Sequence, residues 1–315
     1  MKVLITGGTG FIGSNLAKRL LEEGFDVYVL ARHLRKPMIL ELLGVDPGKA
    51  NVVMGDVCCQ ARMLEICRKY SIDFVFHLAA ASIVKWCVEN PALCIRTNVW
   101  GTVNILEVCR MLKIPAIIQS TDKIYGEGMD KRENSPTEPV EIYGASKLAA
   151  DALARAYRRT YELPITVVRP CNTYGPGDLN PRIIPNTIKA CMRNQSPVIF
   201  LGVKGVREYV YVDDLVDALL LLMERIWKAD EVYNIGSGEV KTQEEVVMEV
   251  LKHFPKCKPR YVVAEPRREI EYQSLDSSKI RKLGWKPKVS FSDGITLTVE
   301  WFRSVWNSLK PALQQ

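Results

Sequence analysis

The chain has 315 residues, of which 47% are hydrophobic, and a formal net charge of +7, so its size allows one large α/β domain or a large domain with a smaller one. Its basic residues are spread along the chain rather than clustered with aromatic residues, which argues against a nucleic-acid partner and fits an anionic small ligand. No run of about 18 apolar residues is present to cross a bilayer, and a strand begins at once without room for a signal peptide, so we expect a cytoplasmic protein with no membrane partner.

A glycine-rich turn follows the first predicted strand, which covers residues 3–6 (VLIT). Gly7, Gly10 and Gly13 let the backbone turn sharply and bring its N–H groups close to a pyrophosphate. An amphipathic helix begins at Phe11 and Ile12, and its N-terminus favours negative charge. The pattern predicts a dinucleotide site that includes these five residues. The alternative is a plain tight turn between a strand and a helix.

The second predicted strand, at residues 27–30 (VYVL), ends where a dinucleotide fold keeps the residue that contacts the adenosine ribose. That residue is Ala31 rather than an acidic residue, and Arg32 and Arg35 follow it. Arginines can bind a ribose 2′-phosphate through charge-assisted hydrogen bonds. We therefore expect NADP to be favoured over NAD, the alternative being that these arginines only solvate a loop.

Two further strands are predicted at residues 51–57 and 73–80, each followed by a helical stretch. This alternation predicts a parallel sheet with helices on both faces. Asp56 would lie at the carboxyl edge of the sheet near the adenine, and the small Ala79 and Ala80 would allow a close approach to the cofactor. His77 is interpreted as a core residue at a strand end.

A long helix is predicted at residues 91–113, with Asn98 inside it as a candidate cofactor-binding residue, and a fifth strand at residues 116–120. The sequence STDKIYG continues directly from that strand, at the edge where ligands bind in such sheets. After a polar loop, a strongly helical segment opens at Tyr143. Tyr143 and Lys147 are four residues apart, so both side chains can reach one cleft.

This tyrosine and lysine suggest acid–base chemistry. A free tyrosine has a pKa of about 10, but a nearby ammonium and a cationic oxidised nicotinamide would stabilise the phenolate and lower that pKa. Tyr143 could then accept a hydroxyl proton while hydride leaves the same carbon, and Thr121 could hydrogen-bond the same oxygen. The alternative is an ordinary surface tyrosine and lysine on a helix.

The motifs TGGTGFIG, GDV, HLAA, YGASK, RPCNTYGP and REYVYVDD occur in this order between Met1 and about residue 301. Together they resemble the extended short-chain dehydrogenase/reductases that modify nucleotide sugars. The resemblance implies an α/β fold: a Rossmann-type doubly wound parallel sheet with a smaller C-terminal α/β substrate-binding region. It also implies three groups of site residues: Gly7, Gly10 and Gly13 at the pyrophosphate, Asp56 and Val57 at the adenine, and Thr121, Tyr143 and Lys147 in catalysis.

The second half of the chain is broken by prolines and glycines, as in NTYGPGDLNPR, and such segments build a small lid at a sheet edge. We expect a dinucleotide-binding domain at residues 1–170, with parts of 205–240 returning to it, and a mainly nucleotide-sugar-binding domain at 171–315. The resemblance implies that the sugar-nucleotide diphosphate is held by Asn172, Arg182, Arg207 and one of Arg267 or Arg268. Surface salt bridges are the competing explanation for the arginines.

The pair Asp122 and Lys123 favours a nucleotide-sugar 4,6-dehydratase within this family. Epimerases of the family generally carry small hydroxyl residues there, whereas a dehydratase must also remove the C5 proton and protonate the departing C6 hydroxyl. In dTDP-glucose dehydratases the pair is usually Asp-Glu, so lysine at the second place resembles the CDP-glucose type. Lys123 can be the C5 base only when neutral, and burial near Lys147 would lower its pKa. The alternative is that Asp122 caps a turn and Lys123 faces solvent.

Two other functions remain open. A UDP-hexose 4-epimerase fits the rest of the chain equally well, and a non-catalytic dinucleotide-sensing module is a remote possibility because Tyr143 and Lys147 are both intact. We also expect a homodimer, since the helices at 98–112 and 146–161 carry surplus apolar residues, namely Val99, Ile105, Leu106, Leu148 and Leu153. The nine cysteines lack paired metal spacing, so we expect buried free thiols and no metal.

Overall fold

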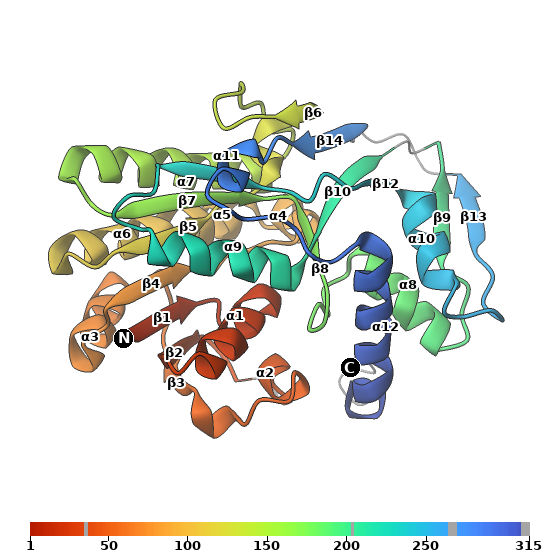
Figure 1. The fold of residues 1–315 in the computed structure, drawn as a ribbon, viewed down its shortest axis with the longest axis horizontal. Coiled ribbons are helices and arrows are strands. Elements are labelled where there is room, and N and C mark those ends of the chain that lie inside the picture. The colour runs from red at the N-terminus through yellow and green to blue at the C-terminus, as the bar shows by residue number, and fades with distance from the viewer. Residues whose placement is uncertain (35–36, 203–204, 264–269, 310–315) are drawn as a thin grey trace.

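The main sheet has seven strands, and every strand pairs in parallel with its neighbours (Figure 1). The computed structural model describes residues 1–34, 37–202, 205–263 and 270–309. From one edge of the sheet to the other the strands are β3 (Asn51–Met54), β2 (Asp26–Ala31), β1 (Lys2–Thr6), β4 (Phe74–His77), β5 (Ala116–Gln119), β7 (Ile165–Pro170) and β11 (Val232–Ile235). The chain builds outward from β1 to β3 and then returns to place β4 beside β1. This reversal is the topological switch point of a doubly wound fold, as the sequence predicts.

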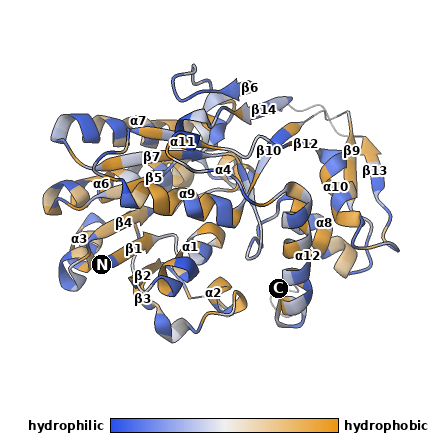
Figure 2. Cartoon of the chain, in the orientation of Figure 1, coloured by the Kyte–Doolittle hydropathy of each residue, from blue (hydrophilic) through white to orange (hydrophobic). Residues whose placement is uncertain are grey.

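The strands are apolar along their whole length because helices cover both faces of the sheet. In β1, Val3 and Ile5 pack against α1 (Phe11–Glu22) and α9 (Val212–Glu224), whereas Leu4 packs against the opposite layer. That second layer contains α3 (Gln60–Tyr70), α6 (Gly101–Leu112) and α7 (Ile142–Tyr161). Figure 2 shows the hydrophobic strands β1 and β4 and the hydrophilic outer surface of helices such as α3.

The smaller region is built around a second sheet, which contains β12 (Val240–Thr242), β10 (Val206–Tyr211), β14 (Tyr272–Leu275) and β6 (Gly128–Lys131), with β8 (Asn172–Tyr174) also paired to β10. A separate strand pair joins β9 (Val198–Leu201) to β13 (Arg260–Val263). The helices of this region are α8 (Ile183–Met192), α10 (Gln243–Leu251) and α12 (Phe291–Leu309). The predicted fold class is therefore confirmed. Strand β6 comes from the first half of the sequence, so the two halves of the chain interlock.

The helix predicted at 91–113 is not continuous. It consists of α5 (Pro91–Ile95), a π-helical turn η2 (Arg96–Trp100) and α6. Asn98 lies in this wider turn, and its side chain binds both backbone groups of Ala81, accepting from the N–H at 2.7 Å and donating to the carbonyl oxygen at 3.1 Å. Such π turns occur frequently at functional sites.

The cysteine prediction is wrong for one pair. Cys87, in α4 (Val84–Glu89), and Cys94, in α5, form a disulfide, because the two short helices bring their Cα atoms to 5.2 Å. Cys59 is free but exposed rather than buried. Within the described ranges no helix is long and apolar enough to span a membrane. The same residues contain no cluster of three or more His, Cys, Asp or Glu side chains that could hold a metal ion.

The remaining short elements connect these layers. They are α2 (Ile39–Leu42), η1 (Pro47–Lys49), the 3₁₀ turn η3 (Asp122–Tyr125) and α11 (Ser278–Arg281). The turn η3 follows β5 directly, so it lies at the carboxyl edge of the main sheet. This is the edge that the sequence predicts to bind ligands.

Candidate active site

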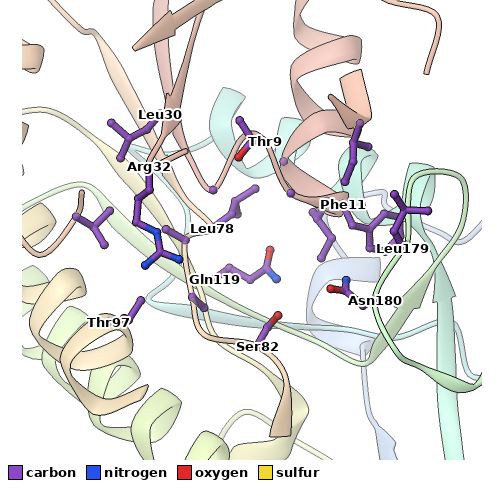
Figure 3. A pocket seen from close by; sticks show the side chains of 18 of the residues that line it. Thr9, Phe11, Leu30, Arg32, Leu78, Ser82, Thr97, Gln119, Leu179 and Asn180 are labelled. Carbon is purple, nitrogen blue, oxygen red and sulfur yellow. The ribbon is translucent and has the colours of Figure 1, made fainter. Parts of the chain in front are cut away.

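A cavity of about 640 Å³ opens at the carboxyl ends of the main strands. Its wall comes from the segments that follow β1, β2, β4 and β5, together with the start of α7 and the loop before α8 (Figure 3). In Figure 3, Thr9 and Phe11 lie at the glycine turn, Arg32 lies near Leu30, and Gln119 lies deeper among the strand ends. The cavity therefore spans the switch point between β1 and β4, where dinucleotide folds bind their ligand.

The glycine turn could not accommodate larger residues. Gly7 has a φ of +72°, and a Cβ atom there would lie 2.8 Å from the backbone nitrogen of Ala79. A Cβ on Gly13 would overlap the carbonyl oxygen of Gly7. The first turn of α1 contains no acidic residue, and no side chain caps it. Its free N–H groups therefore fit the pyrophosphate of a dinucleotide, and the predicted residues Gly10, Phe11, Ile12, Ala79 and Ala80 all line this part of the cavity.

The end of β2 is arranged as the sequence predicts. Ala31 is fully buried, and the exposed Arg32 lines the cavity together with Val57. Arg35 lies outside the described residues. Asp56 does not line the cavity. Its Oδ1 atom accepts a hydrogen bond from the Cys58 N–H at 2.9 Å, which stabilises the turn after β3.

Tyr143 and Lys147 both line the cavity from the first turns of α7. Glu141 caps this helix by accepting hydrogen bonds from the N–H groups of Tyr143 at 2.7 Å and Gly144 at 3.1 Å. Burial lowers the pKa of Lys147 to about 8, with Asp151 partly opposing it. Among the residues that the structure describes, none accepts a hydrogen bond from the Lys147 ammonium, which leaves that group available to a ligand.

The expected lowering of the Tyr143 pKa is not produced by the protein alone. Burial raises the pKa of Tyr143 to about 12, while Arg182 and a hydrogen bond with Thr121 lower it only in part. The expectation relied partly on a cationic nicotinamide, whose charge would have to reverse this shift.

Thr121, Asp122 and Lys123 form a compact hydrogen-bonded group at η3, next to Ser120, but none of the three is among the residues that line the cavity. The Thr121 hydroxyl donates to Asp122 Oδ1 at 3.0 Å, and Lys123 Nζ lies 3.2 Å from Asp122 Oδ2. Asp122 is 2% exposed and the Lys123 side chain 17%. Burial lowers the pKa of Lys123, opposed by Asp122, so the predicted direction is confirmed. Thr121 rather than Asp122 caps the turn, and the lysine does not extend into solvent.

The structure brings only some of the predicted substrate residues to the cavity. Arg182 lines it, and Asp178 lies 3.9 Å from the Arg182 guanidinium. Asn172 instead donates to the Glu208 carbonyl oxygen at 3.0 Å, and Arg207 donates to the Val206 carbonyl oxygen at 3.0 Å. Arg267 and Arg268 lie outside the described residues. Arg207 nevertheless lies close enough to Lys123 to lower the pKa of that lysine.

Asn98 is fully buried and does not line the cavity. Its Nδ2 group donates to Ser146 Oγ at 2.9 Å, and Ser146 in turn donates to the Tyr143 carbonyl oxygen at 2.7 Å. Asn98 thus joins the loop after β4 to the first turns of α7, which carry Tyr143 and Lys147. His77 is a buried core residue, as predicted, and its ring is hydrogen-bonded to Thr6 and Thr102.

Sequence reasoning missed several cavity residues. Gln119 ends β5 and Ser120 follows it, and both residues line the cavity. The Gln119 Oε1 atom is buried without a hydrogen-bond partner. Their place at the end of a predicted strand was a usable signal. Asn180 lines the cavity from the Gly/Pro-rich segment NTYGPGDLNPR, and Ser82 lines it from the loop after β4, although neither residue was singled out from the sequence. The unpartnered amide oxygen, like the glycine turn, fits a cavity built for a polar cofactor.

Comparisons with known proteins agree with this geometry. A model of the NAD dependent epimerase/dehydratase family matches residues 3–236. The dTDP-glucose 4,6-dehydratase of Salmonella typhimurium is 34% identical over 338 residues, covering 96% of this chain and 92% of that protein.

Two solved structures show the same fold. The crystal structure of dTDP-glucose 4,6-dehydratase from Streptomyces venezuelae, with NAD bound, has a TM-score of 0.88 at 31% identity and covers 99% of each chain. That of UDP-glucose 4-epimerase from Thermotoga maritima, with UDP-glucose, has a TM-score of 0.88 at 32% identity and covers 97% of this chain and 100% of that one. The chain therefore belongs to the NAD dependent epimerase/dehydratase family and is an enzyme of the extended short-chain dehydrogenase/reductase type.

Proposed function

We propose that this enzyme is a nucleotide-sugar 4,6-dehydratase. The observation that carries the proposal is the buried Asp122–Lys123 pair beside Thr121 at the carboxyl end of β5. A 4-epimerase needs one acid–base group at the C4 oxygen, whereas a 4,6-dehydratase also needs a base for the C5 proton and an acid for the C6 oxygen. Lysine beside aspartate supplies both groups within one turn.

In this proposal Tyr143 removes the proton from the C4 hydroxyl, and Thr121 holds the same oxygen by a hydrogen bond. Lys147 binds the nicotinamide ribose and favours the tyrosinate. A bound nicotinamide held by Lys147 would supply the hydride chemistry, which is removal of hydride from C4 and its return to C6. The C4 ketone acidifies the C5 proton, so elimination requires only a weak base and a nearby acid.

The contact between Lys123 and Asp122 explains how one pair can supply a neutral amine and a protonated carboxyl. Transfer of one proton across the 3.2 Å contact turns an ammonium and a carboxylate into an amine and a carboxylic acid. Lys123 then takes the C5 proton, and Asp122 gives its proton to the leaving C6 oxygen, which departs as water. Lys123 returns its proton to C5 when hydride reaches C6. Solvent carries the proton gained by Tyr143 back to Asp122.

We further propose that residues 1–170 bind the dinucleotide and that 171–315 mainly hold the nucleotide sugar. Arg182 is the best-placed diphosphate ligand, because it lines the same cavity as Tyr143 and arginine forks suit phosphate oxygens. Arg207 on β10 and Asn172 on β8 are not among the residues that line this cavity. Lysine at position 123 favours CDP-glucose as the substrate.

Incubation with CDP-, dTDP- and UDP-glucose and GDP-mannose tests the proposal. The expected product is a 4-keto-6-deoxy sugar, seen by its ultraviolet absorbance in base and by a mass lower by one water. The second candidate is a UDP-hexose 4-epimerase, which is favoured by the equally similar epimerase from Thermotoga maritima. An epimer of unchanged mass would support that candidate and overturn the dehydratase.

Cofactor choice is expected to depend on Arg32. We propose that NADP is favoured over NAD, because the exposed Arg32 guanidinium lines the cavity beside buried Ala31. The double variant Ala31→Asp with Arg32→Leu should shift the preference toward NAD by about 1–3 kcal/mol, the contribution of one or two charge-assisted hydrogen bonds. Calorimetric titration with both cofactors measures this shift. Tight NAD binding by the wild type, with no binding of NADP, would show that Arg32 is only solvated.

We propose a homodimer. Of the five apolar residues predicted to form its interface, Val99, Leu148 and Leu153 are half-buried. Ile105 and Leu106 are buried in the core of the same chain. The exposed apolar residues lie on α4, α5 and η2 beside α7, and include Trp86, Leu93 and Trp100, the last 59% exposed. Light scattering at micromolar concentration should give the mass of two chains, and Trp100→Glu with Leu93→Glu should give the mass of one. A wild-type monomer would contradict this prediction.

A further inference from the structure

Gln273 lies opposite the Asp122–Lys123 pair and comes from a distant part of the sequence. It is a residue of β14, fully buried, and β14 packs against η3. Its Nε2 group donates to the Asp122 carbonyl oxygen at 3.0 Å and to the Gly126 carbonyl oxygen at 3.1 Å. Its Oε1 atom accepts a hydrogen bond from Lys123 Nζ. Every polar atom of this amide is therefore engaged with the turn that carries the proposed acid and base.

The partners allow only one orientation of the Gln273 amide. Both carbonyl oxygens accept hydrogen bonds, so they require the amide nitrogen, and Lys123 Nζ requires the amide oxygen. The reversed orientation would place the amide N–H groups of Gln273 against the N–H groups of Lys123. It would also place the amide oxygen against the carbonyl oxygens of Asp122 and Gly126. The lysine nitrogen is thus held between two fixed acceptors, Gln273 Oε1 and Asp122 Oδ2, the latter at 3.2 Å.

We propose that Gln273 is a positioning residue that aims Lys123 Nζ at the substrate C5 proton. This inference rests on the proposed function, because it assigns Gln273 a role in the same elimination. A neutral amine has two N–H groups and one lone pair. Once the Asp122 proton has turned toward the C6 oxygen, Asp122 Oδ2 can accept an N–H group from the amine. With one N–H group directed to Asp122 and the other to Gln273, the lone pair has one direction left. Without Gln273, the flexible lysine chain would lose this orientation, and oriented groups react much faster than free ones.

The charges around Lys123 come from several elements. Asp122 lies beside it in η3, Arg207 faces it from β10, and Glu141 and the Cys171 thiol also interact with it electrostatically. A change at Gln273 leaves all of these groups in place. Any resulting shift in the Lys123 pKa therefore reports on Gln273 itself.

Two substitutions move the Lys123 pKa in opposite directions. Gln273→Met keeps the length of the side chain but removes the acceptor that stabilises the ammonium, so the Lys123 pKa should fall. Gln273→Glu places a carboxylate there, so the Lys123 pKa should rise by about one unit or more. Competitive acetylation of Lys123 across pH, followed by peptide mapping, measures the midpoint without requiring turnover.

The kinetic readout is exchange of the C5 hydrogen with deuterated solvent. Gln273→Met should lower kcat at least about tenfold and change KM by no more than about twofold. The reason is that the variant loses the orientation of Lys123 Nζ toward the C5 proton but keeps the groups that bind substrate. The acid limb of the exchange rate should move to higher pH in Gln273→Glu and to lower pH in Gln273→Met, since the base must be neutral. If Gln273 only held β14 against η3, its substitution would lower the stability of the protein without shifting the acid side of this pH profile.

Ser274→Ala is the matched control. Ser274 is the next residue of β14 and receives a hydrogen bond from the Asp130 N–H at 2.8 Å, away from Lys123. This variant should lose some thermal stability and keep the wild-type midpoint and pH profile. If both Gln273 variants give the same Lys123 midpoint as Ser274→Ala, the inference is overturned. If the midpoints shift as expected but no nucleotide sugar gives a 4-keto product, the proposed function fails instead, and with it the role of Gln273 in elimination.

Discussion

Replacing Tyr143 by phenylalanine is expected to lower kcat by a factor of about 10²–10⁴, the usual contribution of a general acid–base group, while cofactor affinity stays nearly unchanged. The substitution removes one oxygen and little packing, and the glycine turn that would hold the pyrophosphate is not touched. Lys147→Ala should reduce both turnover and cofactor affinity, because Lys147 lines the cavity with no acceptor for its ammonium in the described part of the chain. Steady-state kinetics and calorimetric cofactor titration measure the two effects.

Tyr125→Phe is the matched control for this experiment. Tyr125 is 1% exposed, and its hydroxyl donates to Asn234 Oδ1 at 2.8 Å in a buried network that includes Arg169. Its loss should lower thermal stability by about 1–3 kcal/mol, because buried partners lose a hydrogen bond, with kcat nearly unchanged. A Tyr143→Phe enzyme with a near-normal rate would show that another base removes the C4 hydroxyl proton.

Lys123→Ala and Asp122→Asn are expected to separate oxidation from elimination. Both variants should still oxidise C4, so absorbance of the reduced cofactor should accumulate in the near ultraviolet. Lys123→Ala should stop solvent exchange at C5, and Asp122→Asn should stop the loss of water, each lowering dehydration by a factor of about 10²–10⁴. Rapid-mixing absorbance and mass spectrometry of the sugar follow the two steps.

Asp130→Asn provides the control for these two variants. Asp130 is exposed on β6 and hydrogen-bonded to Ser274, so it tests the loss of a nearby carboxylate without the proposed chemistry. It should dehydrate the substrate at the wild-type rate. If Lys123→Ala and Asp122→Asn also retain full turnover, the pair is structural and the enzyme is better described as an epimerase.

The parts of the fold that the sequence predicted are those set by local patterns. The glycine turn at Gly7 to Gly13 follows from backbone sterics within a few residues, and the strands at Val3 and Val27 are continuous apolar runs. The spacing of Tyr143 and Lys147 on one helix likewise needs no tertiary information. Consequently the doubly wound sheet, the cavity edge and the glycine turn were all predictable.

The parts that the sequence did not predict depend on long-range pairing. Gln273 reaches Asp122 because β14 pairs with β6 and β10, and no local pattern encodes a contact across 151 residues. The Asn98 side chain binds Ala81 through a π turn, which an uninterrupted helical pattern conceals. Asp56 has the expected position in the chain, but its carboxylate is used by its own turn.

The pKa shifts of the site residues could not be predicted fully without the structure. A lysine one turn away from Tyr143 indicates a lowered tyrosine pKa. In the structure burial raises the pKa of Tyr143 to about 12, and the groups that oppose this shift are Arg182 and Thr121. For Lys123 the predicted direction was confirmed, since burial lowers the pKa of an amine. The sequence prediction named Lys147 as the charged neighbour of both groups, whereas the structure places Arg182 near Tyr143 and Arg207 near Lys123. The extent of desolvation likewise follows only from packing.

The central claim is elimination of water across C5 and C6, and one measurement tests it most directly. The wild-type enzyme is incubated with CDP-glucose in deuterated water, and the product is weighed by mass spectrometry and fragmented to locate deuterium. We expect a 4-keto-6-deoxy product that has lost one water and carries one solvent deuterium at C5, because Lys123 exchanges its proton with solvent before returning it. A product of unchanged mass with inverted C4 and no deuterium at C5 would contradict it.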